Sequence, residues 1–114
     1  MSVFTASTAH VTPDPDMLER FRRLAVDWKR QSRYLSNSAQ MAMLDPYQRI
    51  IGMGPMVVPL ILEELRREPD HWFWALESIT EKNPVPPEAM GKVRLMAAAW
   101  LHWGQKQGLI GNGT

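Results

Sequence analysis

The sequence predicts an all-α protein, folded as a compact bundle of four to five helices. Apolar residues recur at helical spacing in several segments, and proline or glycine separates these segments. No stretch shows the alternation of apolar and polar residues that is typical of a strand. The chain has 114 residues, 45% of them hydrophobic, which is enough for one buried core. We therefore expect a single domain over residues 14–108, with flexible tails at 1–13 and 109–114.

The first helix is predicted over residues 16–33. The preceding Pro-Asp-Pro-Asp run is a typical helix start, because the prolines fit outside the helix and carboxylates favour its positive end. The apolar face at helical spacing is Met17, Phe21, Leu24 and Trp28. The other face carries Arg20, Arg22, Arg23, Lys29, Arg30 and Arg33 against one internal acid, Asp27.

Three helical segments are predicted for the middle of the chain. A short one spans 39–44, and a second begins at Asp45, whose carboxylate we expect to cap the helix while Gln48 completes a capping box. That helix ends at the glycines of residues 52–54. The third begins around residues 57–59, where a proline costs no hydrogen bond, and ends at Pro69.

Two more helices are predicted towards the C-terminus. One begins at Pro69-Asp70 and stops before the proline-rich connector of residues 83–87. The other begins near Pro87 or just after Gly91 and runs to about Gln107, with a glycine as its stop. Their apolar faces comprise Trp72, Leu76 and Ile79 in the first, and Val93, Met96, Ala97, Trp100 and Trp103 in the second.

The segment from Ile50 to Thr80 resembles the HEAT-like repeat family. Its first half reads I-x-x-M-G-P-x-x-V-P-L-I-L-x-x-L, and its second half is centred on Ala75-Leu76. The resemblance implies a helix pair that builds a core and presents a surface to partners. One repeat is recognisable, and the Trp-Phe-Trp of residues 72–74 is bulkier than such a second helix usually carries, so we expect a closed bundle and not a solenoid. The chain is also similar to small bacterial proteins of no assigned function.

Motifs for chemistry are missing from the sequence. The histidines at positions 10, 71 and 102 have no metal-ligand spacing, and there is no H-E-x-x-H. The absence of cysteine removes disulfides, thiolate catalysis and cysteine-ligated zinc. The glycines of residues 52–54 lack the lysine and the preceding strand of a phosphate-binding loop. We predict a protein that is not an enzyme, with no catalytic residue, cofactor or metal site.

The sequence also bears on location. The N-terminus has no basic segment followed by an apolar one, as a signal peptide would. Glu63, Glu64 and Asp70 interrupt the most hydrophobic zone, which leaves no run long enough to span a bilayer. Together with the lack of cysteine, this predicts a cytoplasmic protein that does not contact membranes.

The tryptophans, five in number, allow two interpretations. Trp72 and Trp74 lie about 200° apart on a helix, so they cannot both face one core. In the first interpretation Trp28, Trp72 and Trp100 are core, while Trp74 and Trp103 fill seams between helices. In the second, Trp74 and Trp103 belong to an exposed patch that docks a partner, because tryptophan is enriched at interface hot spots. We expect the first for most of them and the second for one or two.

The basic face of the first helix allows three interpretations. It is a solvated surface, a site for an acidic protein partner, or a site for nucleic-acid phosphates. Positive residues number 13 and negative ones 12, so the chain as a whole does not demand nucleic acid. No recognition-helix motif accompanies the arginines, and a solvated face is what any surface helix requires.

The sequence therefore predicts a protein–protein interaction module: an adaptor, regulatory or inhibitor subunit. It would bind an acidic protein, or a second copy of itself, through an aromatic and methionine-rich surface and the basic helix. The candidate residues are Trp74, Trp103, Arg22, Arg23 and Arg30. The alternative is a nucleic-acid-binding regulator, antitoxin-like, that uses the arginine-rich first helix.

Overall fold

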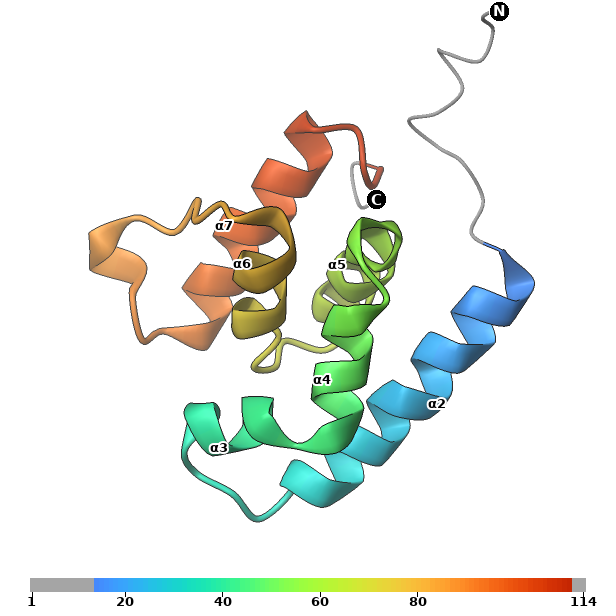
Figure 1. Ribbon diagram of the computed structural model, residues 1–114. Helices are drawn as coiled ribbons and strands as arrows, with labels where there is room; N and C mark the ends of the chain where they lie inside the picture. The colour runs from blue at the N-terminus through green and yellow to red at the C-terminus, as the bar shows by residue number, and fades with distance from the viewer. Residues whose placement is uncertain (1–13, 112–114) are drawn as a thin grey trace, which may run out of the picture.

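The fold is all-α, as predicted. The computed structural model describes residues 14–111, and within them there are six α-helices and no strand (Figure 1). The predicted tail of residues 1–13, with His10, lies outside the described residues. The helices are α2 (Pro15–Ser32), α3 (Ser38–Met43), α4 (Asp45–Gly52), α5 (Val58–Arg67), α6 (Phe73–Thr80) and α7 (Val93–Lys106), with short 3₁₀ turns η2 (Pro55–Val57) and η3 (Pro87–Ala89).

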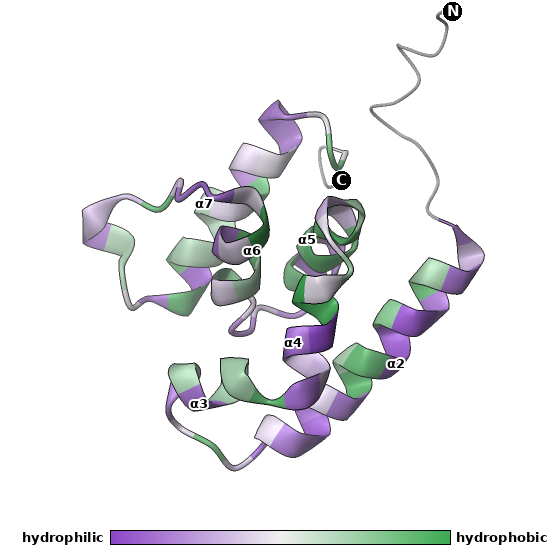
Figure 2. Cartoon of the chain, in the orientation of Figure 1, coloured by the Kyte–Doolittle hydropathy of each residue, from purple (hydrophilic) through white to green (hydrophobic). Residues whose placement is uncertain are grey.

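The helices pack around α4 and α5. Helix α2 lies along α4, α6 packs on both α4 and α5, and α7 packs on α5. Six of the ten residues of α5 are buried. Figure 2 shows purple and green alternating along α2. The hydrophobic stripe of α2 therefore faces the core and its basic stripe faces outward, as an amphipathic surface helix requires.

The helix starts predicted at the Pro-Asp-Pro-Asp run and at Asp45 have different outcomes. Helix α2 begins at Pro15, one residue before the predicted start, so this proline lies in the first turn and not outside the helix. The carboxylate of Asp14 caps it by accepting a hydrogen bond from the backbone N–H of Asp16 at 3.2 Å. The capping box at Asp45 is wrong, because the extended Leu44 is the N-cap and Asp45 is already helical. The carboxylate of Asp45 instead accepts from Arg49 at 2.7 Å. As predicted, residues 38–52 form two helices, which meet at the extended Leu44. The described residues contain six α-helices, one more than the predicted four to five.

Helix α6 begins later than predicted. It starts at Phe73, because the turn from Pro69 to Trp72 uses its polar groups locally. The carboxylate of Asp70 accepts a hydrogen bond from the backbone N–H of His71 at 2.7 Å. The backbone carbonyl of Asp70 accepts one from the backbone N–H of Trp72 at 2.9 Å. Aspartate side chains compete for backbone donors in this way at helix boundaries.

The packed domain extends beyond the predicted boundary at residue 108. Gly108 has φ +75° and ends α7 as expected, but Ile110 is 4% exposed and Arg66 donates a hydrogen bond to the carbonyl of Gly111 at 2.6 Å. A Cβ at Gly104 would lie 2.6 Å from the Cδ1 atom of Leu62 and 3.4 Å from Ile110. Residues 109–111 are thus packed and not a flexible tail; residues 112–114 lie outside the described part.

Four aromatic side chains join α2, α4 and the start of α6 in the core. We call Phe21, Trp28, Tyr47 and Trp72 the aromatic cluster. The rings of Trp28 and Trp72 lie 4.5 Å apart between centroids, and Tyr47 stacks on Trp72 at 5.9 Å. The indole N–H of Trp28 donates to the carbonyl of Met41 at 2.8 Å, which also fixes α3. The three tryptophans predicted for the core, which include Trp100, are fully buried.

The hydroxyl of Tyr47 holds the start of α6. It accepts a hydrogen bond from the backbone N–H of Ala75 at 2.9 Å and donates one to the carbonyl of His71 at 3.0 Å. The first backbone N–H groups of a helix have no partner within the helix, so this hydroxyl supplies one. Burial raises the pKa of the Tyr47 phenol, so the group remains a hydrogen-bond donor at neutral pH.

Candidate interaction surface

A groove of about 660 Å³ opens beside α6. Its lining residues come from α6 and the turn before it, from the segment that joins η3 to α7, from the first turn of α7, and from Ser38 at the start of α3. We call this site the Trp74 groove. Its lining residues are Ser38, His71, Phe73, Trp74, Glu77, Ser78, Met90, Gly91, Val93 and Met96.

Trp74 lies at the outer face of α6. Its side chain is 47% exposed, although a tryptophan is among the most favourable residues to bury. Glu77 and Ser78 follow at spacings of three and four residues, so they share this face, while Ala75 and Leu76 are buried on the opposite one. Helix α6 thus presents one face to the core and a second face, with an aromatic ring, to the groove.

Methionine supplies the facing wall. Met90 is 53% exposed, and Val93 and Met96, which also line the groove, are partly buried. Gly91, with φ +83°, turns the chain between η3 and α7. Unbranched thioethers adapt their shape to a neighbour at low cost, so this wall suits a surface that repacks around a bound group.

Trp103 occupies a different position from Trp74. It is partly buried and packs edge-on against Trp100, with ring centroids 5.3 Å apart. It does not line the groove, but it follows Met96 by seven residues, which places it on the same face of α7 two turns later. The two tryptophans predicted as partner-binding are therefore one groove residue and one flanking residue.

The charge of the groove comes from one carboxylate. Among the ten lining residues, Glu77 is the one Asp, Glu, Lys or Arg. It is exposed and forms no ion pair with the residues that the structure describes. The other polar groups are the hydroxyls of Ser38 and Ser78 and the imidazole of His71. The site is thus a groove in which half of the ten lining residues are apolar and one is an exposed carboxylate, unpaired within the described residues.

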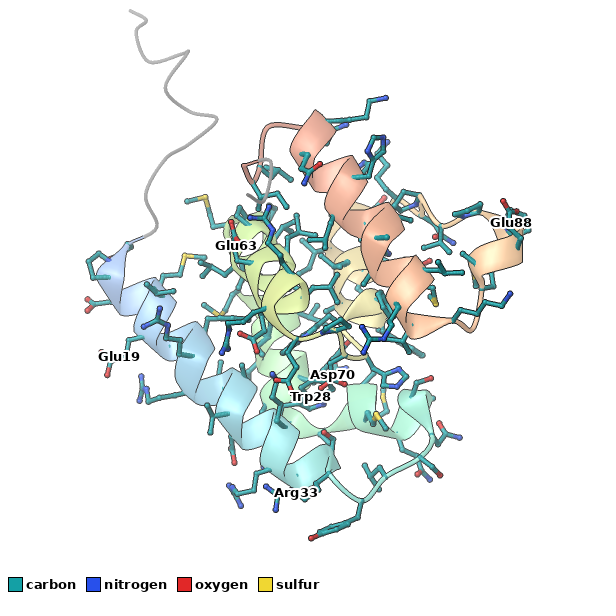
Figure 3. The ribbon with its side chains drawn as sticks, turned by 180° about the vertical axis from the view of Figure 1, so that it is seen from behind. Glu19, Trp28, Arg33, Glu63, Asp70 and Glu88 are labelled. Atoms are coloured by element: carbon teal, nitrogen blue, oxygen red, sulfur yellow. The ribbon has the colours of Figure 1, made fainter. Side chains whose placement is uncertain are left out.

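The arginines of α2 lie on another surface. Arg22, Arg23 and Arg30 are exposed, and none of them lines the Trp74 groove. Figure 3 shows Glu19 on α2 and Glu88 on η3 at opposite edges of the molecule, with Trp28 between them. The five candidate residues from the sequence therefore belong to two separate surfaces.

Part of the basic face is already neutralised within the chain. Lys29 donates to Glu64 at 2.5 Å and to Glu68 at 2.6 Å, which ties α2 to α5. Arg30 pairs with Asp27 one turn earlier on the same helix. Arg22 borders a smaller cleft, of about 510 Å³, whose other basic residues are paired with glutamates of α5. The face is thus less available to a partner than the sequence suggests.

The link between α2 and α5 shifts the pKa values of its members. Burial by itself would raise the pKa of Glu64, but hydrogen bonds from Lys29 and Arg67, with their positive charges, lower it below its usual value. Burial likewise opposes the charge of Lys29, yet its two carboxylate partners raise its pKa. Both groups are therefore ionised at neutral pH, and the link is structural.

The sequence predicted that Trp74 belongs to an interaction surface, but it did not predict which residues line the groove with it. Met90 and Met96 are conspicuous as methionines, and Glu77 follows Trp74 at helical spacing, but nothing local predicts that residues 90–96 return to α6. Within residues 14–111, no cluster of three or more His, Asp or Glu could hold a metal ion. None of the described helices combines the length and apolar character that crossing a membrane requires.

Comparison of the chain with protein-family models, with curated proteins and with solved structures found no match. The function is therefore inferred from the surface of the molecule.

Proposed function

We propose that this protein is a non-catalytic interaction module, an adaptor or regulatory subunit, and that it binds a protein partner through the Trp74 groove. The observation that carries the proposal is a half-exposed tryptophan within a groove whose other apolar lining residues are Phe73, Met90, Val93 and Met96. Tryptophans in such positions contribute a large share of binding energy, because a partner removes a large apolar area from water. The exposed Met90 opposite adds an adaptable apolar wall.

The polar groups of the groove do not form a catalytic arrangement. Ser38, His71 and Glu77 all line it, which are residue types of a hydrolytic triad. In the described structure, however, no hydrogen bond joins any two of these side chains. A nucleophile needs its base, and the base its orienting group, within hydrogen-bond reach. This favours a binding role for the groove.

The experiment is capture of the tagged protein with its partners from the extract of its native cells, followed by mass spectrometry. Wild type, Trp74→Ala and Tyr34→Ala are compared, with and without nuclease. Tyr34 is the matched control, because it is an aromatic residue, 88% exposed, that does not line the groove. We expect a stoichiometric protein that survives nuclease and is lost with Trp74→Ala alone. A partner set unchanged by Trp74→Ala contradicts the proposal.

A second candidate function is a nucleic-acid-binding regulator that uses α2. The observation that favours it is a set of exposed arginines that form no ion pair with described residues: Arg20, Arg22 and Arg23 on this helix, and Arg33 directly after it. Such binding would fall steeply between low and physiological salt, because counterions are released from phosphates. It would also be lost when Arg22, Arg23 and Arg30 are replaced by Glu. A capture that disappears with nuclease would favour this candidate.

A further inference from the structure

We infer that the occupant of the Trp74 groove is an amphipathic α-helix that carries a lysine or arginine beside its apolar face. This inference rests on the proposed function, because it names the partner chemistry of the same groove. It follows from two features of the described residues. They form no sheet to which a strand could be added, and the carboxylate in the groove, that of Glu77, has no ion pair among them.

The walls of the groove favour a helix over an extended strand. A strand binds mainly by adding to an exposed sheet edge, and residues 14–111 contain no sheet. A helix satisfies its own backbone hydrogen bonds and can present an apolar stripe alone. Phe73 and Trp74 on one wall, and Met90, Val93 and Met96 on the other, offer apolar surface to such a stripe.

The charge of the partner follows from a comparison of carboxylates. Five of the twelve acidic residues are in ion pairs, and seven form none with the residues that the structure describes; the five are Asp27, Asp45, Glu63, Glu64 and Glu68. Among the seven, Glu77 is the one that lines the groove. A carboxylate at the rim of an apolar surface attracts a cation and repels an acidic partner. The partner helix therefore has a basic residue that reaches Glu77 when its apolar stripe contacts Trp74.

The probe is a displayed library of random 16-residue peptides. It is selected on the wild-type protein and counter-selected on Trp74→Ala and, separately, on Met90→Ala, so that the result does not depend on one variant. We expect the retained peptides to repeat apolar residues at i, i+3 or i+4, and i+7, with Lys or Arg beside this stripe. A synthetic peptide from this set should gain helical circular dichroism when it binds.

A charge exchange then tests the role of Glu77. Glu77→Lys should weaken the binding of the basic peptide about three- to fivefold, the range of an exposed ion pair. Exchange of the peptide's basic residue for Glu should restore binding to this variant. Glu19→Lys is the matched control, because Glu19 is exposed on α2 outside the groove, and it should leave the affinity unchanged.

The outcomes separate this inference from the function on which it rests. Groove-dependent peptides that are rich in proline, acidic or without helical period would overturn the inference and leave the interaction function in place. Self-association of the chain through the groove, seen as a dimer lost in Trp74→Ala, would also overturn it, since the occupant would then be a second copy. If no peptide depends on Trp74 or Met90, both the inference and the proposed use of the groove are rejected.

Discussion

Trp72 and Trp74 are two residues apart at the start of one helix and have opposite environments. Trp72 is fully buried and contacts three other aromatic rings, those of Phe21, Trp28 and Tyr47. Trp74 is 47% exposed and lines a groove. The core face of α6 is closed by helices from far along the chain, whereas its outer face is not. The same residue type should therefore contribute to folding at one position and to binding at the other.

The polar groups of the two faces differ in the same way. On the core side, the hydroxyl of Tyr47 has two backbone partners and the indole of Trp28 has one. On the groove side, the carboxylate of Glu77 is paired with none of the described residues. Most buried polar groups in proteins are hydrogen-bonded, although the buried indole N–H of Trp72 has no partner among the described residues. Exposed polar groups can remain available to a partner.

Trp72→Ala should have the largest effect on stability. The substitution removes a ring from the centre of the aromatic cluster and leaves a cavity among Phe21, Trp28 and Tyr47, so the free energy of unfolding should fall by about 3–5 kcal/mol. Urea denaturation followed by circular dichroism measures this loss. A loss below about 1 kcal/mol would show that the cluster does not hold α2, α4 and α6 together.

Tyr47→Phe isolates the hydrogen bonds of the cluster from its packing. The ring remains, but the buried N–H of Ala75 and the carbonyl of His71 lose their partner, which should cost about 2 kcal/mol. Tyr34→Phe is the control, because that hydroxyl is exposed and its removal should change nothing. Equal melting curves for wild type and Tyr47→Phe would mean that the start of α6 does not depend on this hydroxyl.

These two residues also show why the fold was only partly predictable. Helical periodicity and the proline and glycine positions indicated the helices, because those signals are local. The start of α6 is set partly by the local turn at Asp70, but one backbone N–H of its first turn is bound by a hydroxyl 28 residues earlier in the chain, and no local signal reports that contact. Ile110 likewise packs beside Gly104 only because the chain turns back after α7, which the local sequence does not show. Residues 109–111, which we expected to be part of a tail, therefore belong to the domain.

The candidate site was predictable to the same limited degree. The angle between Trp72 and Trp74 on a helix requires that one of them leave the core, and the structure exposes Trp74. The facing wall of Met90 and Met96 depends on how the connector after α6 returns, which is a tertiary property. Lys29 appeared as part of a free basic face because its partner Glu64 lies 35 residues away.

Glu64→Gln tests the link between α2 and α5 through its pH dependence. The pKa of Glu64 is lowered in the folded protein. The contribution of Glu64 to the free energy of unfolding is therefore present above the ordinary carboxyl pKa, and it is lost as the pH falls through the pKa of the folded protein. The variant should lose about 1 kcal/mol at neutral pH. Unfolding followed between pH 7 and about pH 3 should show the two proteins converging in stability at the acid end. A constant difference across this range contradicts the assignment.

Lys29 also stabilises this link, but its contribution depends on pH in the opposite direction. Its pKa is raised in the folded protein, so its share persists through neutral pH and is lost only as the pH rises through the folded value. The convergence at acid pH therefore reports on Glu64 alone.

Trp74→Ala should have the smallest effect on stability and the clearest effect on binding. Because the ring is half exposed and outside the aromatic cluster, its loss should change the free energy of unfolding by no more than about 0.5 kcal/mol. The same denaturation experiment that measures Trp72→Ala measures this value. A loss of several kcal/mol would place Trp74 in the core and remove the contrast between the two faces of α6. If the denaturation curve of Trp74→Ala is unchanged and partner binding is lost, Trp74 acts in binding and not in folding.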